Sequence, residues 1–573
     1  MKKTLLACGL VLLMLFCSFG VMAADTDSET RYVVTFKDGQ IPSSSQSRLS
    51  AEGELDEALR SDGEESWLVV DKETADALAN DPNVESIEET GVSYLSYTPN
   101  DTYFGRQYAL SMLNASAAWD YGYMGSSDLN VVVIDSGFDF NHEDKGLVKK
   151  GTDYLTGNQT IDLSHGTFCA GIIGAGLNNG IGMSGVLQYG NVYMIRCFYY
   201  DAQENGTVSD NYTISRAIRA AVDSYDADVI SMSFGSKADD SVLREAINYA
   251  RSKGVILVAA SGNQGTAGSP LEYPAAYNGV IGVGSVDEDY GISYFSTRNS
   301  SVDVVAPGGS VFSLMTNNRY GIGSGTSYAT PYVAALAGMA LSYDSNLSAS
   351  EFEQFLKKTS TDLGTTGYDY TYGSGLINYE AFMSDLTSGS FCDVPSDCWY
   401  ESAVYEMSDA KIVEGRSRYI FDPENTTTRA EFVTMLARLS GDNIDQYNGT
   451  SHFTDVSSGS WFNKYINWAY EEGIVMGITE NTFAPDAKIN RAQMSTMMAR
   501  YLDVKGIDLT VTDPDITFGD QSSIPDWAME SVMEMAQAGM LKGFDDGTFG
   551  PERNARRCEA VTILSRLTEV SGS

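Results

Sequence analysis

Three short motifs place an acid, a base and a nucleophile in fixed order along the chain. Asp135 ends the apolar run 131–134, His165 lies in a Ser-His-Gly-Thr motif, and Ser327 lies in the Gly-Thr-Ser motif 325–327. A serine hydroxyl becomes a strong nucleophile when an imidazole removes its proton, and a carboxylate can fix the tautomer of that imidazole. The chain has only 3 histidines, so few side chains can act as a base near neutral pH. The pattern predicts acyl transfer through Asp135, His165 and Ser327.

The other two histidines are weaker candidates for the base. His142 follows the acidic residue Asp135 too closely to belong to a different element, so we expect a structural role. His452 lies in a repeated region near the C-terminus, and we expect it at the surface.

The elements around the motifs alternate between apolar strands and helices over 98–387. Strands are predicted at 130–134, 191–196, 228–232, 255–260 and 280–284, and helices at 211–224 and 240–253 among others. This alternation is typical of an α/β fold with a doubly wound parallel sheet covered on both faces. Sites in such folds lie at the carboxyl ends of the strands. Asp135 ends one predicted strand and Asn263 follows another, so both are expected at that edge.

Charge and the N-terminal segment limit the possible partners. The formal net charge is −40, which repels phosphate backbones and argues against nucleic-acid binding. Residues 1–24 combine Lys2 and Lys3 with a long apolar run and a Val-Met-Ala end, a pattern typical of a secretory signal peptide. We expect no membrane association after its cleavage. An uncleaved membrane anchor is the alternative.

The segment 25–97 predicts a small α+β domain. It contains strand-like runs at 31–36 and 67–70, a helical stretch at 74–80 and a short strand from about 84. Five cysteines follow the signal segment, too few for a disulfide framework. Cys392 and Cys398 could bridge a small loop, and free thiols are equally compatible with the sequence.

The C-terminal part is an array of three repeats, at 388–450, 451–513 and 514–573. In each repeat a Trp is followed at the same spacing by a Gly and then by an Arg. The pattern predicts a helix-rich unit with one helix after the Trp and a second beginning at the Arg. Capping boxes are predicted at 428–431 and 490–493. The repeated residues are Trp399, Trp461 and Trp527, with Arg429, Arg491 and Arg557.

The motifs at 135–142, 165–171, 260–263 and 325–331 resemble those of subtilisin-like serine proteases. The resemblance covers about 98–385 and includes thermitase-like and proteinase K-like features. It implies that Asp135, His165 and Ser327 form the catalytic triad and that Asn263 stabilises the oxyanion. Among the departures, Tyr328 stands where Met usually follows the nucleophile. The segment 25–97 resembles the subtilisin propeptide, which implies an inhibitory chaperone domain that binds the enzyme it precedes.

The resemblance also implies how a peptide substrate binds. Ser233, Phe234 and Gly235 match the edge segment that pairs with the substrate backbone, and Glu272 matches the floor of the main specificity pocket. A carboxylate there could favour Lys or Arg before the scissile bond. However, self-cleavage of a propeptide must fall near 93–98, and 73–105 contains no Lys or Arg. We therefore expect broad specificity that tolerates apolar and aromatic residues.

A further implication of the resemblance is a structural Ca²⁺ site. The segment 177–183 resembles the calcium loop of the family, and oxygen ligands suit this ion. A glycine-rich surface turn without an ion is the alternative. The implied ligands are the carbonyls of Leu177, Ile181 and Met183 with the side chains of Asn179, Asp101 and Asp144.

The repeat array resembles S-layer homology domains, which attach exported proteins to cell-wall polysaccharide in bacteria. The resemblance implies that Arg429, Arg491 and Arg557, at helix starts, bind an acidic group of secondary cell-wall polysaccharide. For the regularly spaced Trp residues, core packing is favoured over stacking on sugars, and a pure spacer is the alternative for the array.

Together these features predict a secreted, wall-attached or S-layer-attached serine endopeptidase made as a zymogen, which acts on proteins and peptides. A non-catalytic surface adhesin or scaffold that retains the protease fold is the alternative.

Overall fold

The computed structural model describes residues 31–36, 67–71, 78, 84–89, 98–155, 159–396 and 398–571. The chain divides into two compact units, 1–95 and 96–573. The predicted signal peptide at 1–24 and almost all of the predicted helix at 74–80 lie outside the described residues. In the described part of the chain, no helix combines the length and apolarity that a membrane span requires.

The first unit contains a three-stranded antiparallel sheet. β1 (Arg31–Phe36) is the central strand, with β2 (Trp67–Asp71) on one side and β3 (Val84–Glu89) on the other. A bulge interrupts the pairing of β1 with β3 between Thr35 and Phe36. The strands fall where the sequence predicts them.

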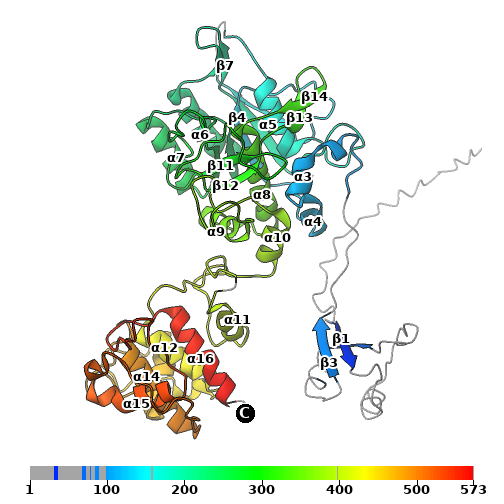
Figure 1. The fold of residues 1–573 in the computed structure, drawn as a ribbon. Coiled ribbons are helices and arrows are strands. Elements are labelled where there is room, and N and C mark those ends of the chain that lie inside the picture. Colours follow the sequence, from blue (N-terminus) through cyan, green and yellow to red (C-terminus); the bar gives the residue numbers. More distant parts are fainter. Residues whose placement is uncertain are drawn as a thin grey trace, which may run out of the picture. The chain divides into compact units, whose positions relative to one another are not determined.

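A seven-stranded parallel sheet forms the centre of the segment 98–387 (Figure 1). Its central strands carry uninterrupted runs of buried apolar residues, as expected for strands covered on both faces. In spatial order, the strands are β12 (Val304–Pro307), β11 (Ile281–Val286), β10 (Ile256–Ala260), β9 (Val229–Met232), β4 (Asn130–Asp135), β6 (Asn191–Arg196) and β5 (Val148–Asp153).

Helices cover both faces of this sheet, so the predicted doubly wound architecture is confirmed. α5 (Ser164–Gly174) and α8 (Thr326–Tyr343) share a hydrophobic core with one face. α6 (Asn211–Tyr225) and α7 (Ser241–Ser252) share another core with the opposite face. Alternate residues of one strand enter the two cores, with Val131 and Val133 of β4 on the first side and Val132 and Ile134 on the second.

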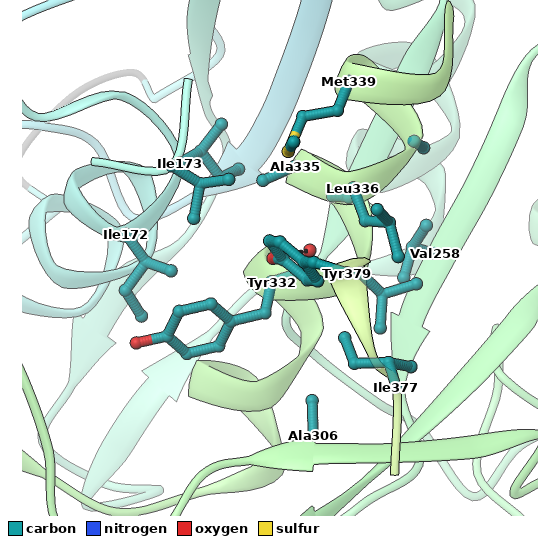
Figure 2. Packing of buried hydrophobic residues seen from close by; sticks show 14 of the residues in the cluster. Ile172, Ile173, Val258, Ala306, Tyr332, Ala335, Leu336, Met339, Ile377 and Tyr379 are labelled. Carbon is teal, nitrogen blue, oxygen red and sulfur yellow. Dashed lines mark hydrogen bonds between the residues drawn. The ribbon is translucent and has the colours of Figure 1, made fainter. Parts of the chain in front are cut away.

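α8 is the helix that organises the first core. Nearly all of its residues are buried, as expected for a helix that is apolar on every side. Figure 2 shows Tyr332, Ala335, Leu336 and Met339 of this helix packed beside Ile172 and Ile173 of α5 and Val258 of β10. This packing fixes the first turn of α8, which carries Ser327.

Smaller elements complete the domain. The N-terminal side contributes η2 (Phe104–Arg106), α3 (Tyr108–Met112) and α4 (Ala115–Asp120). Two hairpins pair β7 (Tyr199–Asp201) with β8 (Gly206–Val208) and β13 (Val311–Met315) with β14 (Arg319–Gly323). α9 (Ala349–Thr359) and α10 (Tyr379–Thr387) follow α8.

The three repeats form a helical array with one hydrophobic core. The second helix of each repeat packs on the first helix of the next, and the third repeat returns to the first. The array therefore closes into a ring. The helices are α11 (Glu401–Asp409) and α12 (Arg429–Leu439), α13 (Asn463–Glu471) and α14 (Arg491–Lys505), and α15 (Asp526–Gln537) and α16 (Arg557–Ser571), with short 3₁₀ helices η3 (Ile444–Tyr447) and η4 (Gln521–Ser523).

Both predicted capping boxes are present, at Thr428 with Glu431 and at Asn490 with Gln493. The Trp residues differ from the prediction of core packing. Trp399, Trp461 and Trp527 are 59%, 59% and 56% exposed. Each lies at the start of the first helix of its repeat, where the ring leaves it uncovered.

Candidate active site

Asp135 and His165 form a close pair at the carboxyl edge of the sheet. Asp135 ends β4 and is 3% exposed, and His165 is the second residue of α5. The Nδ1 atom of His165 lies 2.8 Å from Oδ1 and 2.9 Å from Oδ2 of Asp135. The carboxylate also accepts the backbone N–H of Ser136, at 2.6 Å. These contacts orient the imidazole and place its proton on Nδ1.

Two opposing effects act on the pKa of His165. Burial lowers it, because a charged imidazolium loses hydration, whereas the negative charge of Asp135 raises it. The charge prevails, and the pKa of His165 lies well above its ordinary value. The imidazole is therefore neutral, and able to act as a base, only above that raised pKa.

Ser327 lies in the first turn of α8, with its backbone held by groups from two other elements. Pro331 has no N–H, so the Ser327 carbonyl lacks its normal partner one turn later. The hydroxyl of Ser233 donates to that carbonyl at 2.8 Å, and the thiol of Cys169 donates at 3.5 Å. The Ser327 hydroxyl donates in turn to the carbonyl of Ser233, at 3.1 Å.

Asn263 is oriented by the residue that precedes Ser327. Its side-chain oxygen accepts the backbone N–H of Thr326 at 2.9 Å and the Thr326 hydroxyl at 3.0 Å. Because Oδ1 of Asn263 accepts both bonds from Thr326, its Nδ2 group points away from Thr326 and can donate to a ligand. A Cβ built on Gly325 would lie 3.6 Å from this nitrogen and 3.7 Å from the backbone nitrogen of Ser327. Two N–H donors therefore lie beside the same glycine.

These groups line one cavity of about 310 Å³. It brings together eight of the residues singled out from the sequence: Asp135, His165, Asn263, Ser327, Ser233, Phe234, Gly235 and Glu272. A second cavity of about 230 Å³ shares Phe198, Thr207, Phe234 and Gly235 with the first. Its lining combines apolar side chains such as Ile214 and Leu243 with polar ones such as Ser209 and Asn211. Two cavities that share a wall suit an extended ligand with several side chains.

Some residues at the site were not assigned a role from the sequence. Thr326 holds Asn263, although it was read only as part of the nucleophile motif. Tyr328 packs against Phe168 with ring centroids 4.1 Å apart, and against His165 at 5.7 Å. Burial raises the pKa of Tyr328 to about 12, so it stays neutral beside the base. The position of Tyr328 directly after Ser327 in the sequence could have indicated that it lies at the site.

Cys169 lies beside the base, with its Sγ atom 3.9 Å from Nδ1 of His165. Burial raises the pKa of this thiol, which keeps it uncharged. His142 is 2% exposed, accepts the backbone N–H of Asp144 and contacts the carbonyl of Arg319 at 3.0 Å, which fits the expected structural role. Cys392 and Cys398 are free thiols.

The predicted calcium ligands gather around the loop at 177–183. Asp101 accepts the backbone N–H groups of Asn178 and Asn179, each at 2.8 Å. Asp144 accepts the Asn179 amide at 2.8 Å and the Met183 N–H at 2.8 Å. The two carboxylates are 5% and 0% exposed, and neither forms an ion pair within the described residues.

Burial raises the pKa of Asp144 to about 6, and the charge of Asp101 adds to the rise. Two buried carboxylates, one amide oxygen and nearby carbonyls are the hard oxygen donors that Ca²⁺ requires. The residues present therefore fit this ion, which would neutralise the carboxylates.

The predicted wall-binding arginines lie at the contacts between neighbouring repeats of the ring. Arg429, Arg491 and Arg557 begin α12, α14 and α16 and are 4%, 4% and 2% exposed. Each donates its Nε–H to a carbonyl of the next repeat, at 2.9, 2.8 and 3.0 Å, to Phe483, Phe549 and Phe421 respectively. Burial lowers the pKa of all three guanidinium groups. The arginines therefore connect the repeats through their Nε atoms.

Comparison with known proteins identifies both parts of the chain. The subtilase family model matches residues 126–375, and the S-layer homology domain model matches 390–433, 452–495 and 517–561. The chain is 40% identical to a thermophilic serine proteinase of Bacillus sp. (strain AK1) over 52% of its own length and 72% of the relative. It is 34% identical to subtilisin J of Geobacillus stearothermophilus over 66% of its length and 97% of the relative. It is 37% identical to thermitase of Thermoactinomyces vulgaris over 48% and 96%.

The resemblance read from the motifs is confirmed. The chain belongs to the subtilase family, as a subtilisin-like serine endopeptidase with three S-layer homology domains that indicate attachment to the bacterial cell surface.

Proposed function

We propose that the chain is a secreted, wall-attached serine endopeptidase, made as a zymogen, that cleaves peptide bonds through Asp135, His165 and Ser327. One observation carries the proposal. The Asp135–His165 pair, Ser327 and the Asn263 amide all line the same 310 Å³ cavity. The adjoining cavity, which offers room for a second side chain, supports a polypeptide substrate rather than a small ester.

In the proposed reaction, His165 removes the hydroxyl proton of Ser327 as the oxygen attacks the peptide carbonyl. Asp135 holds the imidazole and stabilises the imidazolium, which then protonates the leaving amine. The oxyanion accepts hydrogen bonds from the Asn263 amide and from the backbone N–H of Ser327, which lies in a helix turn with no intrahelical acceptor. Water then attacks the acyl-enzyme. His165 takes the proton of this water and returns it to the Ser327 oxygen as the acid product leaves.

The zymogen part of the proposal concerns 25–97. We propose that this segment inhibits the enzyme until cleavage near 93–98, and that specificity is broad and tolerant of apolar and aromatic residues. Purified wild-type protein should hydrolyse casein. Mass spectrometry should place its N-terminus near residues 93–98. The variant Ser327→Ala should be inactive and retain the segment. Casein hydrolysis by the variant, at the wild-type rate, would refute the proposed nucleophile.

A structural role for Ca²⁺ is part of the proposal. Asp101, Asp144, Asn179 and the carbonyls of Leu177, Ile181 and Met183 would hold the ion. When bound, it would supply positive charge to the buried carboxylates and tie the N-terminal edge of the domain to the loop at 177–183. It takes no part in the proposed reaction.

The ring of repeats is proposed to bind secondary cell-wall polysaccharide. Two features support this. The exposed Trp residues repeat around the ring, and a cationic arginine lies at each contact between repeats with no carboxylate of the described residues within ion-pair distance. Flat aromatic rings can stack on sugars, and a buried cation attracts an acidic substituent. Full-length Ser327→Ala protein should sediment with purified cell walls. Equal sedimentation with walls stripped of polysaccharide would contradict the proposal.

A further inference from the structure

The aromatic ring of Tyr328 is held in a slot formed by three elements. Tyr328 is the third residue of α8, and its ring packs on Phe168 of α5 with centroids 4.1 Å apart. Phe168 is itself 4% exposed, so it forms a fixed wall. A Cβ built on Gly323, the last residue of β14, would lie 2.6 Å from Cε2 of Tyr328. The glycine therefore leaves the space that the ring occupies.

This slot directs the ring of Tyr328 at the imidazole of His165. The two ring centroids are 5.7 Å apart, and the ring planes are inclined by 37°. His165 and Phe168 are three residues apart in α5 and so lie on the same face of that helix, where both meet the tyrosine. Asp135 holds the imidazole through Nδ1 alone, and the His165 side chain remains 31% exposed. The tyrosine ring limits how far the imidazole can turn about that contact.

Tyr328 presents a neutral ring to His165. Burial raises the pKa of Tyr328 to about 12, so its hydroxyl stays protonated when His165 titrates. Within the described part of the chain, the other titratable groups that face the two rings are the carboxylates of Asp135 and Asp162 and the thiol of Cys169. An aromatic face attracts a cation within about 6 Å of its centroid. The imidazolium that forms during the reaction lies within that range.

We propose that Tyr328 is a positioning residue, whose ring keeps the His165 imidazole aligned with Ser327 and stabilises the imidazolium formed there. The ring rather than the hydroxyl carries this role, because the hydroxyl forms no hydrogen bond with any residue that the structure describes. The inference rests on the proposed function, since it needs His165 as the base.

The test compares mature wild-type enzyme with Tyr328→Leu and Tyr328→Phe, using an internally quenched peptide between pH 5 and 10. Leucine fills much of the slot without an aromatic face. We expect Tyr328→Leu to lower kcat about tenfold, with KM changed less than about twofold. The pKa of His165 should fall because its charged form loses an attraction. His165 is active when neutral, so the acid limb should move down by about half to one pH unit.

The conservative variant separates the ring from the hydroxyl. Tyr328→Phe keeps the aromatic face, so it should restore kcat to within about twofold of the wild type and return the acid limb to its place. Tyr189→Leu is the matched control, because Tyr189 is 53% exposed and precedes β6 at the amino edge of the sheet, away from the site. It should alter neither kcat nor the acid limb.

A second variant displaces the ring without changing it. Gly323→Ala adds a methyl group that collides with the ring of Tyr328, so kcat should fall about threefold or more and the acid limb should again move down. This variant decides the question if circular dichroism shows that Tyr328→Leu does not fold. Unchanged kcat and acid limb in Gly323→Ala would then overturn the inference.

The outcomes also distinguish this inference from the proposed function. Loss of kcat in Tyr328→Leu with the acid limb in place indicates a purely structural role and overturns the inference. An equal loss in Tyr328→Phe, or an effect on KM alone, does the same. In each of these cases the wild-type enzyme still cleaves the peptide, so the proposed function stands. A wild-type enzyme that does not cleave it overturns both.

Discussion

Replacing Asp135 by Asn tests the geometry of the acid–base pair. In the wild type, Oδ1 of Asp135 accepts the Ser136 N–H at 2.6 Å, and Nδ1 of His165 lies 2.8 Å from Oδ1 and 2.9 Å from Oδ2. An asparagine oxygen must keep the Oδ1 position, because an NH₂ group cannot accept the Ser136 N–H. The NH₂ group then takes the Oδ2 position and donates to Nδ1. An NH₂ proton directed at Nδ1 repels a proton on that nitrogen, which favours the tautomer with the imidazole proton on Nε2.

An imidazole with its proton on Nε2 cannot accept the proton of Ser327. We expect kcat to fall about 10⁴-fold, equivalent to about 5.5 kcal/mol in the activation barrier. KM should change little, because Asp135 is 3% exposed and holds the imidazole rather than the substrate.

The pH profile should shift in a defined direction. His165 is active when neutral, and Asp135 holds its pKa well above the ordinary 6.5. The acid limb of the wild-type profile therefore lies above pH 6.5, with little activity below about pH 6. Asp135→Asn removes the negative charge, so the pKa of His165 falls and the acid limb of the residual activity moves to lower pH.

The assay is hydrolysis of an internally quenched peptide between pH 5 and 10. Wild-type enzyme first removes the propeptide of the variant and is then inactivated and separated. Asp289→Asn is the matched control, because Asp289 is an exposed carboxylate that accepts the Gly291 N–H. A loss of less than tenfold in Asp135→Asn, or an acid limb that stays in place, would refute this account of the pair.

Three further results are expected. Asn263→Ala should lower kcat about 10²- to 10³-fold with a small change in KM, because the amide is proposed to donate to the oxyanion formed during the reaction. Steady-state kinetics on the same peptide measures this, and an effect confined to KM would contradict it. Chelation of Ca²⁺ by EDTA should lower the Tm of the catalytic domain by about 5 to 10 °C in calorimetry, with no such shift in the variant Asp144→Asn. Arg491→Lys should lower the free energy of unfolding of the ring by about 2 to 3 kcal/mol, because a lysine cannot reach the carbonyls of both Phe549 and Lys542. Trp461→Ala should leave urea unfolding unchanged and weaken wall binding, because this side chain is exposed. A stability loss in the Trp variant and none in the Arg variant would reverse this assignment.

The central sheet was predictable because its strands are buried on both faces. Such strands appear as continuous apolar runs, and the strand predicted at 191–196 has the same bounds in the structure. The helix starts at His165 and Ser327 were also predictable, since apolar helical runs follow both residues.

The edge strand β5 could not be predicted in the same way. Its sequence includes Lys149 and Lys150, both exposed, and it is a strand because β6 pairs with it along one side. Local sequence carries little information about such a partner.

The site shows a similar limit. Asp135, His165, Asn263 and Ser327 were recognisable from motifs, but the support of the Ser327 carbonyl by Ser233 depends on tertiary contact. The repeated Trp residues show that regular spacing identifies equivalent positions without determining burial.

Covalent labelling shows which serine of the protein is the nucleophile. Full-length wild-type protein, processed to its mature form, is treated with a fluorophosphonate, digested, and mapped by mass spectrometry. We expect one modified residue, Ser327, with labelling lost after prior denaturation and in Ser327→Ala. Labelling at a different serine, or none in protein that hydrolyses casein, would contradict it.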